Sequence, residues 1–259
     1  MDEKKKMRLV GLIPRPIRGL ARSLLDKVPV RLESRSLRAE PEQGRYGYQS
    51  RYVQFNIGPN ESVLDLGSGA FPFPYATHLV DRHLEPTEHR NADLVTLDKP
   101  LISADIQSLP FRDGGFDFVY CSHLLEHVDD PIKACAEIMR VGKRGFIETP
   151  TFGNDILANW TNHTHKWHVV NSCNTLCFFE YSPRQSEGIN SSAWRDVIFD
   201  KFHHPLQDAF YQNMDIFNVL FTWVESFGVF VFRNDGTIEC LNAEVRHSGK
   251  QLQRTSQPS

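Results

Sequence analysis

Short apolar runs alternate with helical patterns over residues 63–150. Between the last two runs, the periodicity predicts a helix that begins after Asp130 as N-cap and ends at Gly142. Near-continuous apolar strands that alternate with helices are typical of a parallel sheet covered on both faces. The pattern therefore predicts a doubly wound α/β domain with strands at 62–67, 77–81, 100–106, 116–123 and 145–150.

The pattern changes after Pro150. Residues 151–182 are rich in aromatic residues and histidine and show no clean periodicity, whereas residues 203–221 predict a helix that begins near Pro205. Residues 228–241 predict a hairpin, because a turn sequence separates two alternating runs. We expect four regions: a basic N-terminal arm, a ligand-binding core, a part that completes the sheet and builds the acceptor side, and a flexible tail (1–44, 45–150, 151–245 and 246–259).

Charge is unevenly distributed along the chain. The net charge of −3 over 259 residues argues against a nucleic-acid partner, yet residues 1–38 hold 11 lysines and arginines against 4 acidic residues. The basic arm predicts a weak contact with an anionic membrane surface; a solvated arm or a helix packed on the core is the alternative.

No apolar run is long enough to span a bilayer, and the 5 cysteines are widely scattered. We therefore expect a cytoplasmic protein with reduced thiols.

The segment that follows the first strand has the form of a ligand-binding turn. Asp65 precedes Gly67-Ser68-Gly69, and glycine can adopt a positive φ that lets the backbone approach a ligand closely. The Asp65 carboxylate can accept a hydrogen bond from a ligand ammonium, while N–H groups of the turn can donate to a carboxylate. Where a helix should follow, Phe71-Pro72-Phe73-Pro74 intervenes.

Carboxylates also end the next two strands. Asp81 is placed to hold two ribose hydroxyls, and Asp105 to accept a hydrogen bond from an adenine amino group while Ile106 covers the ring. Together with Asp65, they specify an amino acid, a ribose and an adenine, which is S-adenosylmethionine. A nicotinamide cofactor fits worse, because its fingerprint requires glycine where Pro72 stands.

Three stretches of this region, "VLDLGSGA", "ADIQSLPFRDGGFDFVYCSHLLEHVDDP" and "EIMRVGKRGFIETP", resemble the class I S-adenosylmethionine-dependent methyltransferases of the type-11 kind. The resemblance implies a Rossmann-like, mostly parallel sheet of seven strands with an antiparallel last strand. By position, it implies that Asp65 and the turn hold the methionine portion of the cofactor, Asp81 the ribose, and Asp105 with Ile106 the adenine. Ser122 and His123 would line the methyl-donor cavity.

The chain departs from this family directly after the glycine turn. Phe71 stands where the family usually has its third glycine, and the first helix is shortened or replaced by the Pro-Phe loop. A helix N-terminus favours anions, so we expect another group to help bind the cofactor carboxylate. Arg45 and Arg51 are candidates. Tyr46, Tyr48 and Tyr52 beside them either close over the cofactor or pack in the core. We expect cofactor binding to survive.

Methyl transfer from a sulfonium is an in-line displacement in which the enzyme mainly aligns the two reactants. A hydroxyl acceptor also needs a base, and histidine suits neutral pH. His165 is the first choice and His168 the second, with His123 also near the donor. The spacing of His163, His165 and His168 could indicate a metal site, as could the group of Glu126, His127, Asp129 and Asp130. We expect no metal, because Glu126-His127 recurs in this family without one.

The sequence thus predicts an enzyme that methylates a small molecule, at a hydroxyl of a sugar-containing or natural-product-like compound. The alternative is a non-catalytic protein that binds S-adenosylmethionine as a partner in a complex. A nucleic-acid methyltransferase is disfavoured by the acidic body of the chain. It is also disfavoured because Ser122-His123-Leu124 stands where such enzymes carry an Asn/Asp-Pro-Pro-aromatic motif.

Overall fold

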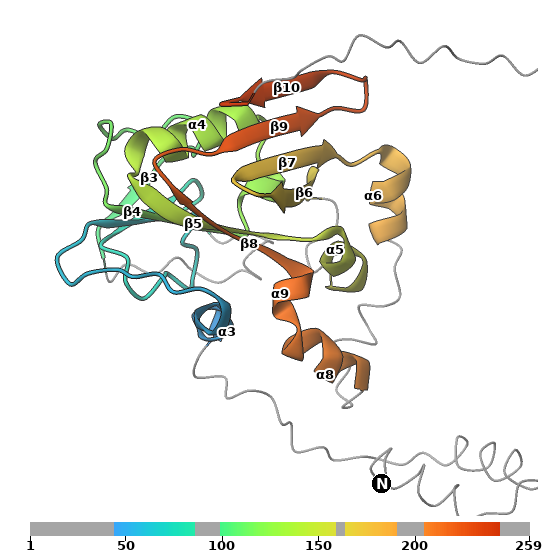
Figure 1. Cartoon of the computed structure of the whole chain (residues 1–259), viewed down its shortest axis with the longest axis horizontal. Helices are drawn as coiled ribbons and strands as arrows, with labels where there is room; N and C mark the ends of the chain where they lie inside the picture. Colours follow the sequence, from blue (N-terminus) through green and yellow to red (C-terminus); the bar gives the residue numbers. More distant parts are fainter. Residues whose placement is uncertain (1–43, 86–98, 159–163, 191–204, 244–259) are drawn as a thin grey trace, which may run out of the picture.

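The computed structural model describes residues 44–85, 99–158, 164–190 and 205–243 (Figure 1). The predicted basic arm up to residue 43 and the predicted tail lie outside the described residues. No helix in the described part of the chain has the length and apolar character needed to cross a membrane.

The centre of the molecule is a six-stranded sheet with the order β3-β2-β1-β4-β5-β8. All neighbouring pairs are parallel except β5 and β8, which run antiparallel. This confirms the predicted Rossmann-like α/β fold with an antiparallel last strand, although the described residues place six strands in this sheet rather than seven. The strands are β1 (Val63–Leu66), β2 (His78–Asp81), β3 (Leu101–Ser103), β4 (Phe118–Ser122), β5 (Arg144–Pro150) and β8 (Asn218–Val224).

A second sheet of four strands, with the order β10-β9-β7-β6, lies beside β5 and β8 (Figure 1). It combines the predicted hairpin of β9 and β10 with a hairpin of β6 and β7, which the sequence did not predict. Strands β7 and β9 join the two hairpins in parallel. The four strands are β6 (Trp167–Ser172), β7 (Thr175–Glu180), β9 (Gly228–Phe232) and β10 (Ile238–Leu241).

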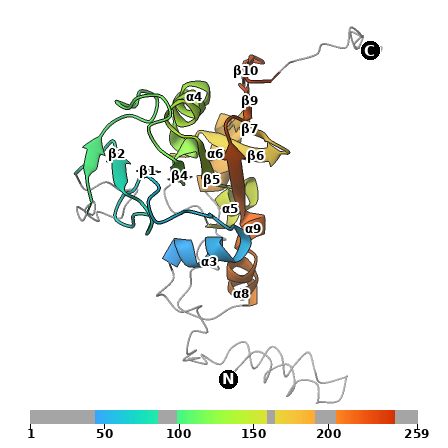
Figure 2. The same cartoon turned by 60° about the vertical axis from the view of Figure 1, so that its left-hand side comes forward.

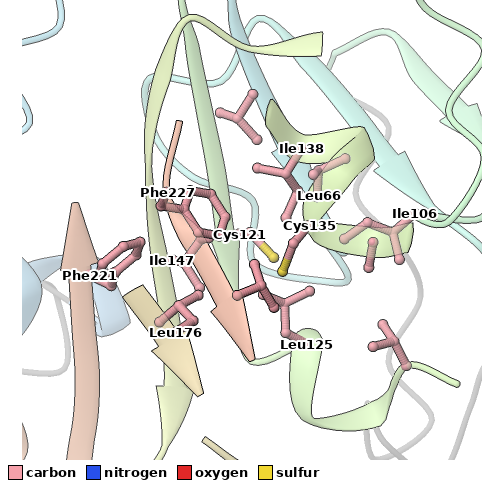
Figure 3. Close-up of a cluster of buried hydrophobic side chains, with 14 of the residues drawn as sticks. Leu66, Ile106, Cys121, Leu125, Cys135, Ile138, Ile147, Leu176, Phe221 and Phe227 are labelled. Carbon is pink, nitrogen blue, oxygen red and sulfur yellow. The ribbon is translucent and has the colours of Figure 1, made fainter. Parts of the chain in front are cut away.

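Helix α4 (Pro131–Val141) and the second sheet cover one face of the central sheet. The Asp130 side chain accepts a hydrogen bond from the Lys133 N–H at 3.1 Å, and Gly142 is the C-cap, so both predicted helix ends are confirmed. Figure 3 shows how Cys135 and Ile138 of α4 point toward Cys121 and Ile147 of the central sheet. These side chains are fully buried, and their burial fixes α4 against β4 and β5.

An aromatic cluster covers part of the opposite face. It consists of Tyr46 from α3 (Gly44–Tyr52), Phe55, Phe73 of the Pro-Phe loop, Tyr120 and Phe146. The Phe73 ring stacks on Tyr120 with 4.1 Å between centroids and 6° between planes. The loop after β1 has no helix, as predicted, and its Phe73 supplies packing instead. Figure 2 shows α3 below the edge of the sheet.

The segment 203–221 differs from its prediction. It forms α8 (Pro205–Gln212) and the short α9 (Met214–Phe217), but the chain becomes extended at Asn218 and continues as β8. The predicted helix is therefore wrong beyond residue 217, because pairing with β5 overrides helical periodicity. The remaining described elements are η4 (Leu125–His127), α5 (Phe152–Ala158) and α6 (Pro183–Asn190).

Candidate active site

The glycine turn after β1 is held against the end of β2. Gly67 and Gly69 have φ values of 72° and 54°, in the left-handed region that the sequence required. The Gly67 N–H donates to the Val80 carbonyl at 2.8 Å, and the Gly69 N–H donates to Asp81 Oδ2 at 3.1 Å. The buried Ser68 Oγ has no hydrogen-bond partner among the described residues, which fits a turn shaped to receive a polar ligand group.

Three carboxylates lie at the carboxyl ends of neighbouring parallel strands, and we call Asp65, Asp81 and Asp105 the carboxylate edge. Asp65 is 2% exposed, and its Oδ2 accepts the Phe73 N–H at 2.7 Å. Asp81 also accepts the His83 N–H at 2.9 Å. Asp105 lies 3.2 Å from Nη1 of Arg82, and the adjacent Ile106 is buried. The structure thus brings the predicted cofactor residues together at one edge.

Ser122, at the end of β4, belongs to a buried polar network centred on Glu148. Its Oγ donates to Glu148 Oε2 at 2.5 Å, and Gln49 Nε2 donates to the same oxygen. Tyr120 donates in turn to Gln49 Oε1 at 3.0 Å. Glu148 was not predicted; the only signal was an acidic residue inside a predicted strand. The network joins β4 and β5 to α3 at the side of the carboxylate edge.

A group of histidines surrounds a buried carboxylate directly after β4, and we call His123, Glu126, His127 and His165 the histidine cluster. Glu126 is 0% exposed, with its Oε1 at 3.5 Å from His123 Nδ1 and 3.8 Å from His127 Nε2. Burial raises the pKa of Glu126, but the contact with His123 and the charges of His127 and His165 outweigh it and lower the pKa to about 2. The cluster can therefore hold negative charge inside the protein.

Asp155 of α5 orients His165. Its Oδ1 lies 2.7 Å from His165 Nδ1, and the Tyr181 hydroxyl donates to Oδ2 at 2.5 Å. Burial lowers the pKa of His165, but the hydrogen bond with Asp155 and the charge of Glu126 outweigh it, so the pKa is raised. Asp155 is 1% exposed and was not predicted, because residues 151–182 gave no pattern that places it near His165.

His168 lies apart from the histidine cluster, in β6 of the second sheet. Its ring packs among Phe152, Phe179 and Tyr181, and burial lowers its pKa. His163 lies outside the described residues. The structure therefore brings His123 and His165 together and leaves His168 in an aromatic environment.

The tyrosines before β1 make structural contacts. The Tyr46 hydroxyl donates to the Tyr75 hydroxyl at 3.1 Å, within the aromatic cluster. The Tyr48 hydroxyl accepts from Asn218 Nδ2 at 3.3 Å, and Tyr52 donates to the Gln212 carbonyl at 3.3 Å. Tyr46 thus packs against the aromatic cluster, whereas Tyr52 is 44% exposed; the contacts of Tyr48 and Tyr52 tie α3 to the C-terminal part of the chain. Of the two predicted cations, Arg51 is exposed, and the side chain of Arg45 is outside the described residues.

An open pocket of about 420 Å³ lies beyond the end of β5. Tyr52, Thr151, Asn171 and Asp215 contribute to its lining, so α3, β6 and α9 all border it. The lining mixes amide, hydroxyl, carboxylate and apolar groups, which suits a polar organic molecule. The residues of the carboxylate edge are not among those that line it.

The strand order, the glycine turn and the carboxylate edge define a Rossmann-like α/β domain that binds a nucleotide-type cofactor. Residues 64–147 match the family model of a methyltransferase domain. They are therefore a class I methyltransferase domain of the type-11 kind, a class whose methyl donor is S-adenosylmethionine.

A curated relative supports this assignment. A demethylmenaquinone methyltransferase of Renibacterium salmoninarum is 34% identical over 111 residues, which are 37% of this chain and 45% of the relative. The chain thus matches less than half the length of that curated relative.

Two solved structures are similar at lower identity. A Haloferax volcanii methyltransferase in complex with the Trm112 activator is 15% identical with a TM-score of 0.45, covering 71% of this chain and 92% of the other. The PH0226 protein of Pyrococcus horikoshii is 16% identical with a TM-score of 0.34, covering 65% of this chain and 87% of the other.

Proposed function

We propose that this protein transfers a methyl group from S-adenosylmethionine to a small-molecule acceptor. The observation that carries the proposal is the carboxylate edge: three acids at the carboxyl ends of β1, β2 and the segment after β3, beside a glycine turn with a buried, unpartnered hydroxyl. This arrangement offers acceptors for the ammonium, the ribose hydroxyls and the adenine amino group in the order in which the donor carries them.

For the donor, we assign Asp65 and Gly67-Ser68-Gly69 to the methionine portion, Asp81 to the ribose, and Asp105 with Ile106 to the adenine. Asp81 and Asp105 are already oriented by backbone N–H groups of nearby residues. Little reorganisation is then needed when the donor binds, which favours affinity. Ser122 is fixed by Glu148 where the methyl-bearing end of the donor would lie.

For the acceptor, we propose a hydroxyl group on a sugar-containing or natural-product-like compound. Oxygen is a weak nucleophile until its proton leaves, and the histidine cluster follows β4 beside Ser122. His165 is the residue on which we expect activation of the hydroxyl to depend, because Asp155 holds its ring in one orientation. Two roles are open to it: base, or ligand of a metal ion. The pocket beyond β5 is the proposed entrance for the acceptor.

The test has two stages with the full-length protein. Calorimetric titration with S-adenosylmethionine should show one binding site, and a screen with a radiolabelled methyl donor should show transfer to a hydroxyl compound in one of several metabolite pools. A demethylated quinone belongs in the screen as a carbon acceptor, because the Renibacterium relative is named for one.

The outcomes separate the alternatives. Binding with turnover supports the proposed enzyme, and the labelled product identifies the methylated atom. Binding without turnover on any pool supports the alternative of a non-catalytic partner protein that uses S-adenosylmethionine as a ligand. Absence of binding contradicts both.

A further inference from the structure

Glu126 is a buried carboxylate whose oxygens have no hydrogen-bond partner among the described residues. The imidazole nitrogens nearest to it, at 3.5 Å and 3.8 Å, are beyond good hydrogen-bonding distance. An ionised carboxylate that leaves water requires a compensating charge or full hydrogen bonding. The neighbouring imidazoles supply such a charge only when they are protonated, so with neutral histidines the Glu126 carboxylate lacks a compensating cation.

The tautomers of two histidines favour a metal ion as that group. His127 Nδ1 lies 3.1 Å from the Thr164 carbonyl, which can only accept, so Nδ1 carries the proton. His165 Nδ1 lies 2.7 Å from the Asp155 carboxylate, and the same argument applies. In the neutral form each ring keeps an unprotonated Nε2, the form in which histidine binds metals.

The geometry of the cluster brings these atoms together. Potential ligand atoms of Glu126, His127 and His165 all lie within 4.8 Å of one another. The two rings are 4.7 Å apart at their centroids and nearly perpendicular, at 74°. One ion can therefore contact both rings and the carboxylate after small side-chain adjustments.

We propose that Glu126, His127 and His165 bind a zinc ion. Two imidazoles and one carboxylate are a recurrent ligand set of zinc sites that keep a fourth position open. Imidazole nitrogens also favour zinc over magnesium or calcium, which prefer all-oxygen sites.

The surroundings of the site match those of metal centres. Metal-bound histidines usually donate their second N–H to a carboxylate or a backbone carbonyl, and Asp155 and Thr164 are in those positions. The Tyr181 hydroxyl in turn donates a hydrogen bond to the Asp155 carboxylate. The side chains of His127 and His165 are 26% and 12% exposed, so an ion can enter from solvent although Glu126 is buried.

The proposed site differs from both groupings that the sequence suggested. His168 packs among aromatic rings rather than beside His165. Asp129 pairs with Lys166, and Asp130 caps α4. The ligand set joins Glu126 and His127, after β4, to His165, before β6, and neither sequence grouping combined these three residues.

The experiment measures zinc directly. Full-length protein is treated with chelator, dialysed, and titrated with zinc chloride in a calorimeter, and metal content is measured by mass spectrometry. We expect one tightly bound ion per chain. Glu126→Gln and His127→Ala should each weaken zinc binding by more than about 100-fold, and Asp155→Asn by about 10- to 100-fold.

His168→Ala is the matched control, because it removes an imidazole of the same segment outside the cluster; its zinc affinity should equal that of the wild type. Circular dichroism shows whether each variant is folded. Equal zinc affinity in the wild type, Glu126→Gln and His127→Ala would overturn the proposal, and so would the absence of zinc binding. Neither readout uses methyl transfer, so the zinc site can fail while the proposed enzyme stands, and the reverse.

Discussion

The carboxylate edge and the histidine cluster are built in different ways, although both lie at the carboxyl ends of strands in the same sheet. Each acid of the carboxylate edge ends or follows its own strand, in chain order, and accepts backbone N–H groups of residues close in sequence. The histidine cluster combines His123 and two residues of η4 with His165, before β6. It depends on Asp155 of α5 and on Tyr181, which follows β7. Local sequence specifies the first region, whereas tertiary packing assembles the second.

This difference has a mechanical consequence. The carboxylate edge keeps its shape as long as the sheet and the Pro-Phe loop are intact. The histidine cluster also requires α5, the start of β6 and the residues directly after β7 to be placed correctly. Substitutions can therefore separate the two regions by affecting donor binding, turnover or folding alone.

The largest effect is expected at Phe73, which packs against the central sheet beside Asp65 of the carboxylate edge. The side chain is 2% exposed and stacks on Tyr120. Phe73→Ala should lower the free energy of unfolding by about 3–5 kcal/mol, because it leaves a cavity against the sheet. Urea denaturation measures the change. Phe71→Ala is the matched control: Phe71 is 78% exposed, and its removal should cost less than about 0.5 kcal/mol. Equal losses in the two variants would show that the loop does not replace the packing of a helix.

At the histidine cluster, His165→Ala should slow turnover by about 10²-fold or more, because activation of the acceptor hydroxyl is lost. The affinity for S-adenosylmethionine should stay nearly unchanged, since the carboxylate edge is not touched. Single-turnover kinetics and calorimetry measure the two quantities separately. His78→Ala serves as control, because His78 lies at the amino-terminal end of β2, whereas the carboxylate edge lies at the carboxyl end. Unaltered turnover in His165→Ala would remove the residue from the reaction.

Asp81→Ala should have the opposite effect to His165→Ala: donor affinity should fall, and turnover should change little. It should weaken binding of S-adenosylmethionine by about 1–3 kcal/mol, the usual cost of a lost charged hydrogen-bond partner. Turnover at saturating donor should change much less. Asp113→Ala is the control, because the Asp113 carboxylate is 83% exposed and lies on a different loop. A dissociation constant equal to that of the wild type would contradict the ribose assignment.

The smallest effect concerns Asp117, a carboxylate at the amino-terminal edge of the same sheet. Hydrogen bonds from Lys143 and from the Ser62 N–H and hydroxyl lower its pKa. Because the pKa is lower in the folded state, Asp117 stabilises the fold above its unfolded pKa of about 3.9, and this contribution is lost as the pH falls through the folded pKa.

Asp117→Asn should therefore lower the free energy of unfolding at pH 7 by no more than about 1 kcal/mol, since the ion pair is accessible to solvent. The difference from the wild type should shrink in strong acid. Urea denaturation at neutral and acidic pH measures both values. A difference that does not depend on pH would mean that the Asp117 charge has no role in stability.

The sequence predicted the fold well where short-range signals agree. The strands and the capped helix between Val63 and Pro150 were predicted because apolar runs, N-cap and glycine all indicated the same boundaries. The β6–β7 hairpin was missed because its turn is Cys173-Asn174, in which Cys173 has a φ of 50° without being glycine. The strand at 218–221 was missed because its apolar residues also continue a helical pattern.

The same contrast between local sequence signals and tertiary contacts applies to the two candidate sites. Every residue of the carboxylate edge could be predicted, because strand ends bring them together regardless of other contacts. Glu148 could not be predicted, since its partners Gln49 and Ser122 are distant in sequence. Asp155 could not be predicted, since residues 151–182 show no pattern that places it against His165 or Tyr181. His168 was ranked beside His165 from spacing alone, and the hairpin places it among aromatic rings instead.

The hydrogen bond between the Phe73 N–H and Asp65 has a consequence for redesign of the enzyme. Asp65 anchors the Pro-Phe loop as well as facing the proposed donor, so replacing it would disturb loop conformation and ligand recognition at once. Efforts to make the protein accept donor analogues with altered sugar or base should therefore begin at Asp81 or Asp105 and leave position 65 unchanged.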